Sequence, residues 1–389
     1  MDDVPAGPAS PGPRRPLLSV VIPVYNGGRD FEHCLRRLRE SDQDGVELIV
    51  VDDGSTDGSA ALAESFGASV VRHQIPLGPA AARNLGARAA TASLVFFLDA
   101  DVAVHPQTLS RAVKRFSDNP SLGALFGSYD ANPSAPGLTS RFRNLLHHYV
   151  HQQGDFVADA RPARTFWTGC GAIRRQAFLD LGGFDPRLYR RPAIEDIEFG
   201  YRLTRAGVPV ILARDIQATH LKRWTLHGMV KTDIFQRGVP WMLLMKRSGI
   251  VETDLNVRND QKVCVAMAGL MSLALLAAPL WPASLLMVPV ALAMIVALNF
   301  GFYRFLAKEK GLAFSVASIP LHYVYYCSCG VSVIIALGLW KLSGKSLASA
   351  VAEPSLNSTG EVRKDPANET SVPQPKTSWA WRPSRWIRR

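Results

Sequence analysis

The sequence has few cysteines, and none of them is spaced for a metal site. The five are Cys34, Cys170, Cys264, Cys327 and Cys329, and they include no CxxC pair. This spacing excludes a cysteine-based zinc site of the usual kind. We expect reduced thiols in a protein part that lies in the cytoplasm, since a disulfide framework would need an oxidising compartment.

The sequence also lacks a nucleic-acid-binding pattern. Its formal net charge is +11, but no basic helix with interleaved aromatic stacking residues precedes residue 261. We therefore expect no nucleic-acid partner. Anionic lipid head groups and phosphorylated substrates account better for the positive charge.

The two ends of the chain lack periodic apolar patterns. Residues 1–16 have many Pro and Gly but no apolar h-region, so we expect a disordered lead and no secretory signal peptide. Residues 343–389 are rich in Ser, Pro, Lys and Asn, and we expect a disordered basic tail there.

Charge is scarce near the C-terminal end, although charged residues make up 20% of the chain. Three apolar runs stand out, and they are Val263 to Pro282, Ala283 to Tyr303 and Phe314 to Trp340. Each has about the 20 residues that a helix needs to cross a bilayer. We predict a transmembrane segment of about three helices over residues 261–342, with a tight hairpin at Trp281 to Ser284. Core helices of a soluble protein are the alternative, but they seldom run this long without charge.

Basic residues ahead of the first apolar run favour a cytoplasmic position for the preceding part of the chain. They are Lys222, Arg223, Lys231, Arg237, Lys246 and Arg247. Three spans would place the C-terminus outside, whereas Lys341 and Lys345 after the third run favour the inside. We expect a multi-pass membrane protein with a cytoplasmic head, and the side of the C-terminus stays open.

The head, residues 17–260, alternates short apolar runs with helical patterns, which is typical of an α/β fold with a parallel sheet covered by helices on both faces. The predicted strands are Leu18 to Pro23, Val46 to Val51, Ala68 to Arg72 and Ser93 to Leu98. The predicted helices are Asp30 to Glu40, Gly58 to Phe66, Pro79 to Ala92, Gln107 to Asp118, Thr139 to Gln152 and Glu195 to Ala206. A further short strand is predicted to open at Thr165 to Gly171.

Acidic residues follow two of the predicted strands, at the sheet edge where α/β proteins bind ligands. Asp99 and Asp101 come directly after a buried strand, where two carboxylates would repel each other unless a cation or hydrogen bonds compensate. Mg²⁺ or Mn²⁺ prefers such oxygen ligands and leaves positions open for substrate phosphates. A capped turn is the alternative for an isolated pair, but the nearby Asp52 and Asp53 favour a cation site.

Asp52 and Asp53 belong to a strand-to-helix turn in which Ser55 or Asp57 could cap the next helix. A carboxylate at this position can also accept a hydrogen bond from a nucleobase or a ribose hydroxyl. Both interpretations stay open.

Several segments, in this order and at these separations, resemble the family 2 glycosyltransferases with a GT-A fold. They are SVVIPVYNG, VVDDGSTDGS, GPAAARNLG and FFLDADV, followed by TGCGAIRR, LGGFD and the pair Glu195 and Asp196. The resemblance runs from about Leu17 to about His220. It implies a Rossmann-like transferase head that binds a nucleotide-sugar donor, with UDP as the expected nucleotide.

The resemblance also assigns roles to single residues. Those that it places at the nucleotide are Pro23, Tyr25, Asp52, Asp53, Arg83, Asn84 and Asp99. It places Asp101 at the metal and the diphosphate, with Asp99 facing the ribose or sugar and counted as a second candidate ligand. His220, after the apparent last strand of the head, is a third candidate ligand, or else a structural histidine.

Glu195 and Asp196 open a helix, where the macrodipole favours acidic residues whatever their function. The resemblance implies that Asp196 is the general base that deprotonates the acceptor hydroxyl, with Glu195 in support. A base is needed because an alcohol is a poor nucleophile, and direct attack on the anomeric carbon inverts its configuration.

Four residues are candidates for contacts with the sugar or the acceptor: Trp167, Gly169, Cys170 and Gly171. The two glycines permit a close backbone approach to a ligand, or they mark a bulge in a strand. Both interpretations stay open.

Gln236, Arg237 and Trp241 invite comparison with the QxxRW motif of processive polysaccharide synthases, but the Arg and the Trp stand in the wrong places. This departure and the small number of spans argue against a processive enzyme. We predict a metal-dependent, inverting transferase that acts on a lipid or lipid-linked glycan. The alternatives are a subunit of a polysaccharide synthase and a non-catalytic nucleotide-sugar-binding protein.

Overall fold

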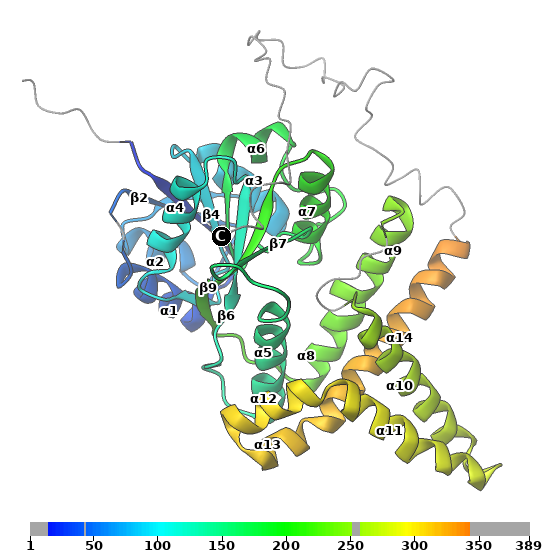
Figure 1. Ribbon diagram of the computed structural model, residues 1–389. Helices are drawn as coiled ribbons and strands as arrows, with labels where there is room; N and C mark the ends of the chain where they lie inside the picture. Colours follow the sequence, from blue (N-terminus) through cyan, green and yellow to red (C-terminus); the bar gives the residue numbers. More distant parts are fainter. Residues whose placement is uncertain (1–14, 43, 251–256, 343–389) are drawn as a thin grey trace, which may run out of the picture.

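The computed structural model describes residues 15–42, 44–250 and 257–342. The predicted basic tail and all but the last two residues of the predicted lead lie outside the described residues. The described chain consists of an α/β head and a group of helices that extends away from it (Figure 1).

Nine strands of the described residues form one mixed sheet in the order β3-β2-β1-β4-β8-β6-β9-β5, with β7 paired to β9. Their bounds are β1 (Leu18–Val24), β2 (Val46–Asp52), β3 (Ser69–Arg72), β4 (Leu94–Leu98), β5 (Val102–Val104), β6 (Ala124–Tyr129), β7 (Ala160–Pro162), β8 (Cys170–Arg174) and β9 (Val210–His220). The four strands predicted for the first half are confirmed, and they pair in parallel. The second half makes the sheet mixed, because β8 runs antiparallel to β4 and to β6 whereas β6 and β9 pair in parallel.

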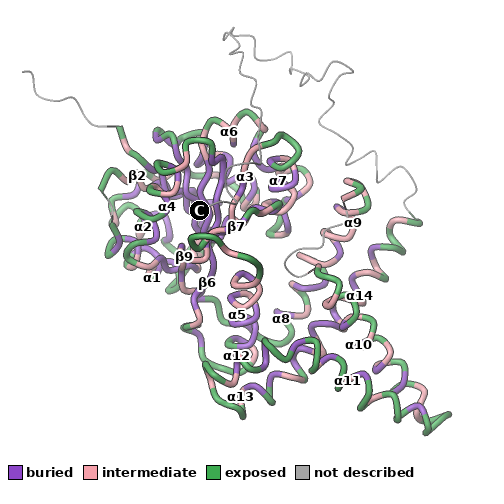
Figure 2. The backbone as a smooth tube through the Cα atoms, in the orientation of Figure 1, coloured by how far each residue is buried: buried purple, intermediate pink, exposed green. Residues whose placement is uncertain are grey.

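Helices cover both faces of the sheet, as predicted. Those of the head are α1 (Gly28–Arg39), α2 (Ser59–Ser65), α3 (Pro79–Ala89), α4 (Thr108–Asp118), α5 (Leu138–His151), α6 (Arg175–Asp180) and α7 (Glu195–Arg205). Alternate residues of β1 face opposite sides: Val20 packs in the cluster with α1 and α4, and Val21 in the cluster with α3, α6 and α7. Figure 2 shows the strands as the most buried part of the molecule.

The strand register brings distant residues to the edge where β4 ends. In the antiparallel pair of β5 and β9, Val102 lies opposite His220. Leu221 N–H donates to the carbonyl of Asp101 over 2.8 Å. His220 is therefore held beside Asp101 by backbone pairing.

The remaining helices form the second part of the structure. They are α8 (Leu226–Lys231), the π-helix η1 (Thr232–Gly238), α9 (Val239–Ser248), α10 (Asn259–Ala277), the 3₁₀-helix η3 (Pro282–Leu286), α11 (Met287–Leu298), α12 (Phe300–Lys310), α13 (Leu312–Ala317) and α14 (Ile319–Leu342). Within the described residues, two segments are long and apolar enough to cross a membrane, 259–277 and 312–342.

The second predicted span is not one straight helix. The segment Pro282–Leu298 and the helix Phe300–Lys310 meet at an angle of 71°. Asn299 Nδ2 donates to the carbonyl of Ile295 over 2.8 Å, and its Oδ1 accepts from Tyr326. A buried amide satisfied in this way ends α11, and α12 then turns to pack on the head, with Phe302 against Tyr149 of α5. The hairpin between the first two runs is confirmed, since Ser284 Oγ donates to the carbonyl of Ala274.

Candidate active site

A cavity of about 210 Å³ lies at the edge of the sheet where β4 ends. Seven of the residues predicted to bind nucleotide, metal or sugar or to act in catalysis line it: Arg83, Asp99, Asp101, Trp167, Glu195, Asp196 and His220. They come from both halves of the head. The cavity is therefore the candidate active site.

Arg83 joins three elements at the centre of this site. Its guanidinium donates to Asp99 Oδ1 over 2.6 Å and to Glu195 Oε1 over 2.8 Å. The side chain is buried, and both carboxylates raise its pKa against the effect of burial. This bridge fixes the end of β4 relative to the start of α7.

Asp196 is the acidic side chain of the cavity whose pKa is raised most clearly. Burial, followed by the neighbouring charge of Glu195, raises the pKa of Asp196 to about 7. Its Oδ1 accepts from the N–H of Ile197, and its Oδ2 from the N–H of Thr168 over 3.3 Å. A carboxyl that titrates near neutrality is suited to proton transfer at physiological pH.

Asp101 and His220 lie close together in the same cavity. His220 Nε2 is 3.7 Å from Asp101 Oδ2, and its ring stacks on Tyr129. Burial alone would raise the pKa of Asp101, but His220 and then Lys222 lower it. His220 Nδ1 is 2.7 Å from Asn144 Oδ1. This contact orients the ring of His220, so that Nε2 faces Asp101 in the cavity.

The geometry at Asp101 and His220 fits a divalent cation with two protein ligands. A carboxylate oxygen of Asp101 and the Nε2 atom of His220 face the same space, and Asn144 orients the histidine as metal-bound histidines are oriented in proteins. No group of three or more His, Cys, Asp or Glu able to hold an ion is found in the described ranges. Asp99 is turned towards Arg83 instead. A cation here would take its other ligands from a diphosphate and water.

Asp52 and Asp53 lie outside the cavity and hold two loops. Asp52 is fully buried, accepts from the N–H of Ser55 and pairs with Arg72. Asp53 accepts from the N–H groups of residues 77 and 78 and contacts His73 Nδ1 over 2.6 Å. These contacts agree with the turn interpretation for Asp52. For Asp53 they position the loop that leads into α3.

Three other residues assigned to the nucleotide also lie outside the cavity. Asn84 is buried, and its amide exchanges two hydrogen bonds with the backbone of Phe184. It therefore anchors the LGGFD turn. Pro23 ends β1 with Val24, and Tyr25 follows with 56% of its surface exposed.

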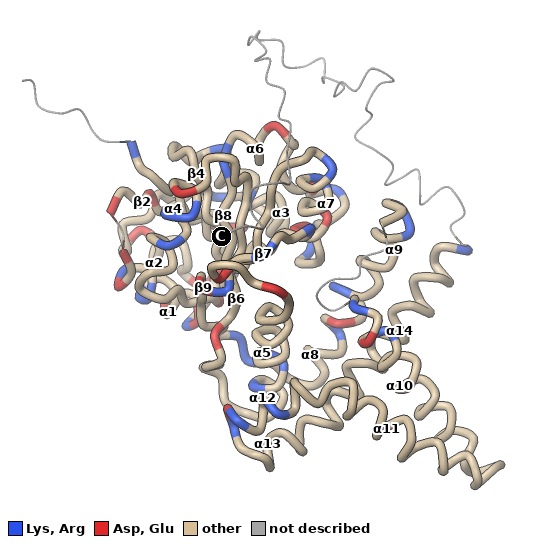
Figure 3. The backbone as a smooth tube through the Cα atoms, in the orientation of Figure 1, with Lys and Arg blue, Asp and Glu red and all other residues tan. Residues whose placement is uncertain are grey.

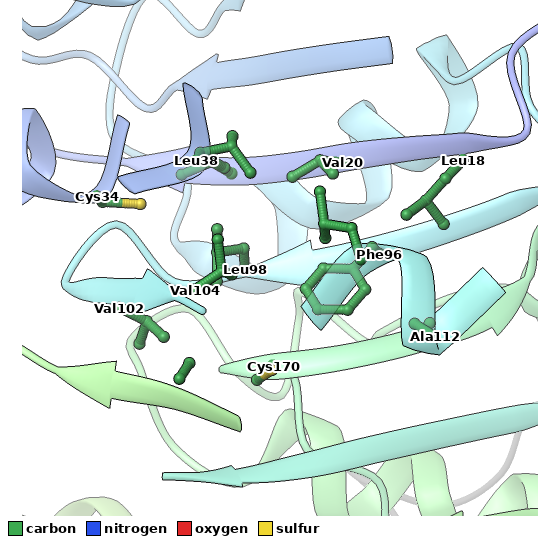
Figure 4. Close-up of a cluster of buried hydrophobic side chains, with 14 of the residues drawn as sticks. Leu18, Val20, Cys34, Leu38, Phe96, Leu98, Val102, Val104, Ala112 and Cys170 are labelled. Carbon is green, nitrogen blue, oxygen red and sulfur yellow. The ribbon is translucent and has the colours of Figure 1, made fainter. Parts of the chain in front are cut away.

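Trp167 lines the cavity, whereas Gly169, Cys170 and Gly171 do not. A Cβ on Gly169 would come within 2.4 Å of the Trp167 ring, so the residue that approaches Gly169 is Trp167. Cys170 begins β8 and is buried in the apolar core next to β4 (Figure 4). Burial raises the pKa of its thiol. Gly171 pairs with Phe97 of β4, and a Cβ on Gly171 would come within 2.2 Å of the carbonyl oxygen of Trp167.

His147 and His151 of α5 line the cavity and were missed in the sequence. Their Nε2 atoms are 3.1 Å apart, and both rings meet Trp167 edge-on or tilted. Burial is the main cause that lowers the pKa of both imidazoles, to about 3 for His151, so both are neutral at pH 7. The spacing of four residues on one helix face was the available signal.

Gln236, Arg237 and Trp241 also line the cavity, despite their departure from the QxxRW spacing. The π-helix η1 adds residues to the turn, which changes the spacing that brings side chains to one face. Trp241 Nε1 donates to the hydroxyl of Tyr201 in α7 over 2.9 Å. Their departure from the motif spacing therefore does not keep these residues out of the cavity.

The mixed sheet, with an acidic strand end and the acidic start of α7 at one edge, has the arrangement of the GT-A fold. Residues 19–182 match the profile of glycosyl transferase family 2. The match covers less than half of the chain, so it is a similarity of this part of the head to the family.

Two curated relatives illustrate the similarity. An uncharacterized protein of Mycobacterium tuberculosis is 31% identical over 50% of this chain and 64% of its own length. Validoxylamine A glucosyltransferase of Streptomyces hygroscopicus subsp. jinggangensis is 31% identical over 59% of this chain and 62% of its own length. The chain thus spans less than two thirds of either relative.

A solved structure has the same fold. The mannosyltransferase of Pyrobaculum calidifontis, in complex with GDP-mannose and Mn²⁺, superposes with a TM-score of 0.52 over 82% of this chain and 88% of that chain. The sequences are 19% identical, so the likeness concerns the fold.

Proposed function

We propose that this chain transfers a sugar from a nucleotide-sugar donor, UDP-linked in the first instance, to a hydroxyl of a lipid or lipid-linked glycan, with inversion at the anomeric carbon. The observation that carries the proposal is Asp196, whose pKa near 7 suits a general base and which shares one cavity with Asp101 and His220. Relatives named as glycosyltransferases support the reaction class.

The donor lies across the carboxyl ends of β1 and β4. Tyr25 is exposed beside the loops that Asp53 holds, where its ring can stack on the base. Asp101 and His220 would hold Mg²⁺ or Mn²⁺ together with the diphosphate. When bound, the cation neutralises charge on the leaving nucleoside diphosphate. Asp99, fixed by Arg83, faces the ribose or the sugar.

Asp196 acts on the acceptor. Its carboxylate takes the proton of the acceptor hydroxyl while the oxygen attacks the anomeric carbon from the side opposite the diphosphate. A glycosidic bond forms as the bond to the diphosphate breaks, so the configuration inverts. The backbone N–H groups of Ile197 and Thr168 keep the carboxylate in place.

The apolar helices support a position of this chemistry at a membrane. Many apolar side chains of α10, α11, α14 and the turn between α10 and α11 are exposed, and they include Leu273, Leu276, Leu280, Leu286, Val290 and Ile334. Such surface suits lipid better than water. Two or three spans anchor a head on the cytoplasmic side, where nucleotide sugars are made.

The test is hydrolysis and transfer from a panel of UDP- and GDP-sugars by the full chain, with and without Mn²⁺. We expect activity with one donor class, dependence on Mn²⁺ or Mg²⁺, and a loss of at least 100-fold in Asp196→Asn. Asp118→Asn, on the exposed face of α4, is the control and should retain activity. Turnover without a divalent cation, or full activity of Asp196→Asn, contradicts the proposed mechanism.

A further inference from the structure

A second and larger cavity lies between α9, α10 and α14. Its volume is about 560 Å³, within the range of sites that hold small ligands. Most of its walls are apolar, and they include Met242, Met245, Val265, Ala266, Tyr325 and Val333. The family 2 profile ends at residue 182, so this cavity lies outside the matched domain.

The two cavities meet at Arg237 and Trp241, which line both of them. This junction is held from two sides. Trp241 is hydrogen-bonded to Tyr201 in the helix that carries Asp196. A Cβ on Gly238 would come within 2.2 Å of Ser332 Oγ, so only glycine lets η1 pack this closely on α14.

The junction carries positive charge. Arg143 pairs with Asp233, and both line the larger cavity. No hydrogen bond or ion pair joins the guanidinium of Arg237 to any residue of the described ranges. Burial and then the charge of Arg143 lower the pKa of Arg237. An anion beside Arg237 would relieve both effects.

The walls of the larger cavity come partly from the membrane anchor. α10 and α14 belong to the two segments long and apolar enough to cross a bilayer. Figure 3 shows almost no charge along α10 and α11 and along most of α14. The mostly apolar walls suit a hydrocarbon chain, and a phosphate beside Arg237 would pair with its guanidinium.

We propose that the larger cavity binds a hydrocarbon chain of the acceptor lipid, and that Arg237 binds a phosphate in the headgroup of the same lipid. The inference rests on the proposed function and narrows its acceptor to a lipid that carries a phosphate near the accepting hydroxyl. The hydrocarbon chain of the lipid lies between α9, α10 and α14, and the headgroup of the lipid passes Trp241 to reach Asp196.

The first arm of the test blocks the cavity. Val333 lines it from α14, whereas Val331, two residues earlier on the same helix, does not line it and is 41% exposed. The full chain in detergent is titrated with tritiated dioleoylphosphatidylglycerol. We expect Val333→Trp to weaken binding at least tenfold and Val331→Trp to change it less than twofold. Thermal melting of both variants checks their folding.

The second arm tests the phosphate. Dioleoylglycerol has the same two chains and a free hydroxyl but no phosphate. We expect the wild type to prefer dioleoylphosphatidylglycerol at least fivefold, and Arg237→Gln to reduce this preference below twofold. Binding of UDP with Mn²⁺ is measured on the same samples.

Equal lipid binding by the two valine variants overturns the inference that the larger cavity binds the hydrocarbon chain of the lipid. A phosphate preference that persists in Arg237→Gln while UDP binding is lost overturns the assignment of Arg237, which would then belong to the donor site. The proposed function fails in a different way, through a wild type that binds the lipid but hydrolyses no nucleotide sugar.

Discussion

The charge of Glu195 is predicted to set part of the working pH of Asp196. The pKa of Asp196 rises from 3.8 to about 7, first through burial and second through Glu195. Because the neighbouring charge is the smaller cause, Glu195→Gln should lower the pKa of Asp196 by about one unit. A general base works only when deprotonated, so the acidic limb of the rate profile should move from about pH 7 to about pH 6.

The assay is kcat/KM for transfer from pH 5 to pH 9, with the donor found in the panel. Below the pKa the rate should fall about tenfold per pH unit. Glu195 also holds Arg83 and the N–H of Ala193, and a Gln amide cannot keep both contacts. The plateau value of kcat/KM should therefore fall too. Only the pH at which the acidic limb lies reports the effect of the charge of Glu195 on Asp196.

Glu198→Gln is the matched control for this substitution. Glu198 lies on the same helix, pairs with Arg202 and does not line the cavity. The acidic limb of Glu198→Gln should lie within about 0.3 pH unit of that of the wild type, because the charge of Glu198 is distant from Asp196 and paired with Arg202. A limb that stays near pH 7 in Glu195→Gln, or that moves equally in both variants, refutes the reasoning.

Three further outcomes follow from the geometry. Asn144→Ala should raise the half-saturating Mn²⁺ concentration about tenfold, because His220 loses the partner that orients it. Gly169→Ala should lower activity and melting temperature, because the new methyl would collide with the Trp167 ring. Asp196→Asn should melt at a higher temperature than the wild type at pH 8 but not near pH 4. Between 3.8 and about 7 the folded carboxyl holds a proton that the unfolded one releases, so the wild type loses stability as the pH rises.

Each of these outcomes has a comparison that can contradict it. Unchanged Mn²⁺ dependence in Asn144→Ala would show that His220 is not a ligand. Gly269→Ala, on α10 with nothing within 4 Å of the new Cβ, should behave as the wild type. If Gly269→Ala lost as much activity and melting temperature as Gly169→Ala, the effect would come from replacing any glycine and not from the contact with Trp167. Asp196→Asn and wild type melting alike at both pH values would refute the raised pKa.

The sequence alone was enough for the first half of the head. The strands ending at Val24, Asp52, Arg72 and Leu98 are continuous apolar runs bounded by turn residues, and buried parallel strands need this local pattern. Asp99 and Asp101 could be placed at the sheet edge for the same reason.

The helix lengths near the membrane were only partly readable from the sequence. Apolar composition identified the runs but not the bend at Asn299, which depends on a hydrogen bond to Tyr326 of α14. A polar residue inside an apolar run can either remain in the helix or end it. The partner that decides comes from elsewhere in the chain.

Tertiary structure decided which candidate residues share the site. The family resemblance pointed to Asn84 and Asp52 as readily as to Arg83, and Cys170 lies within one of its motifs. Burial against the LGGFD turn, the core and the Asp52 loop keeps Asn84, Cys170 and Asp52 out of the cavity. Sequence spacing fixes what a residue's own strand or helix presents. The contacts that bring Arg237 and Trp241 to Asp196 join segments that only the packed chain places together.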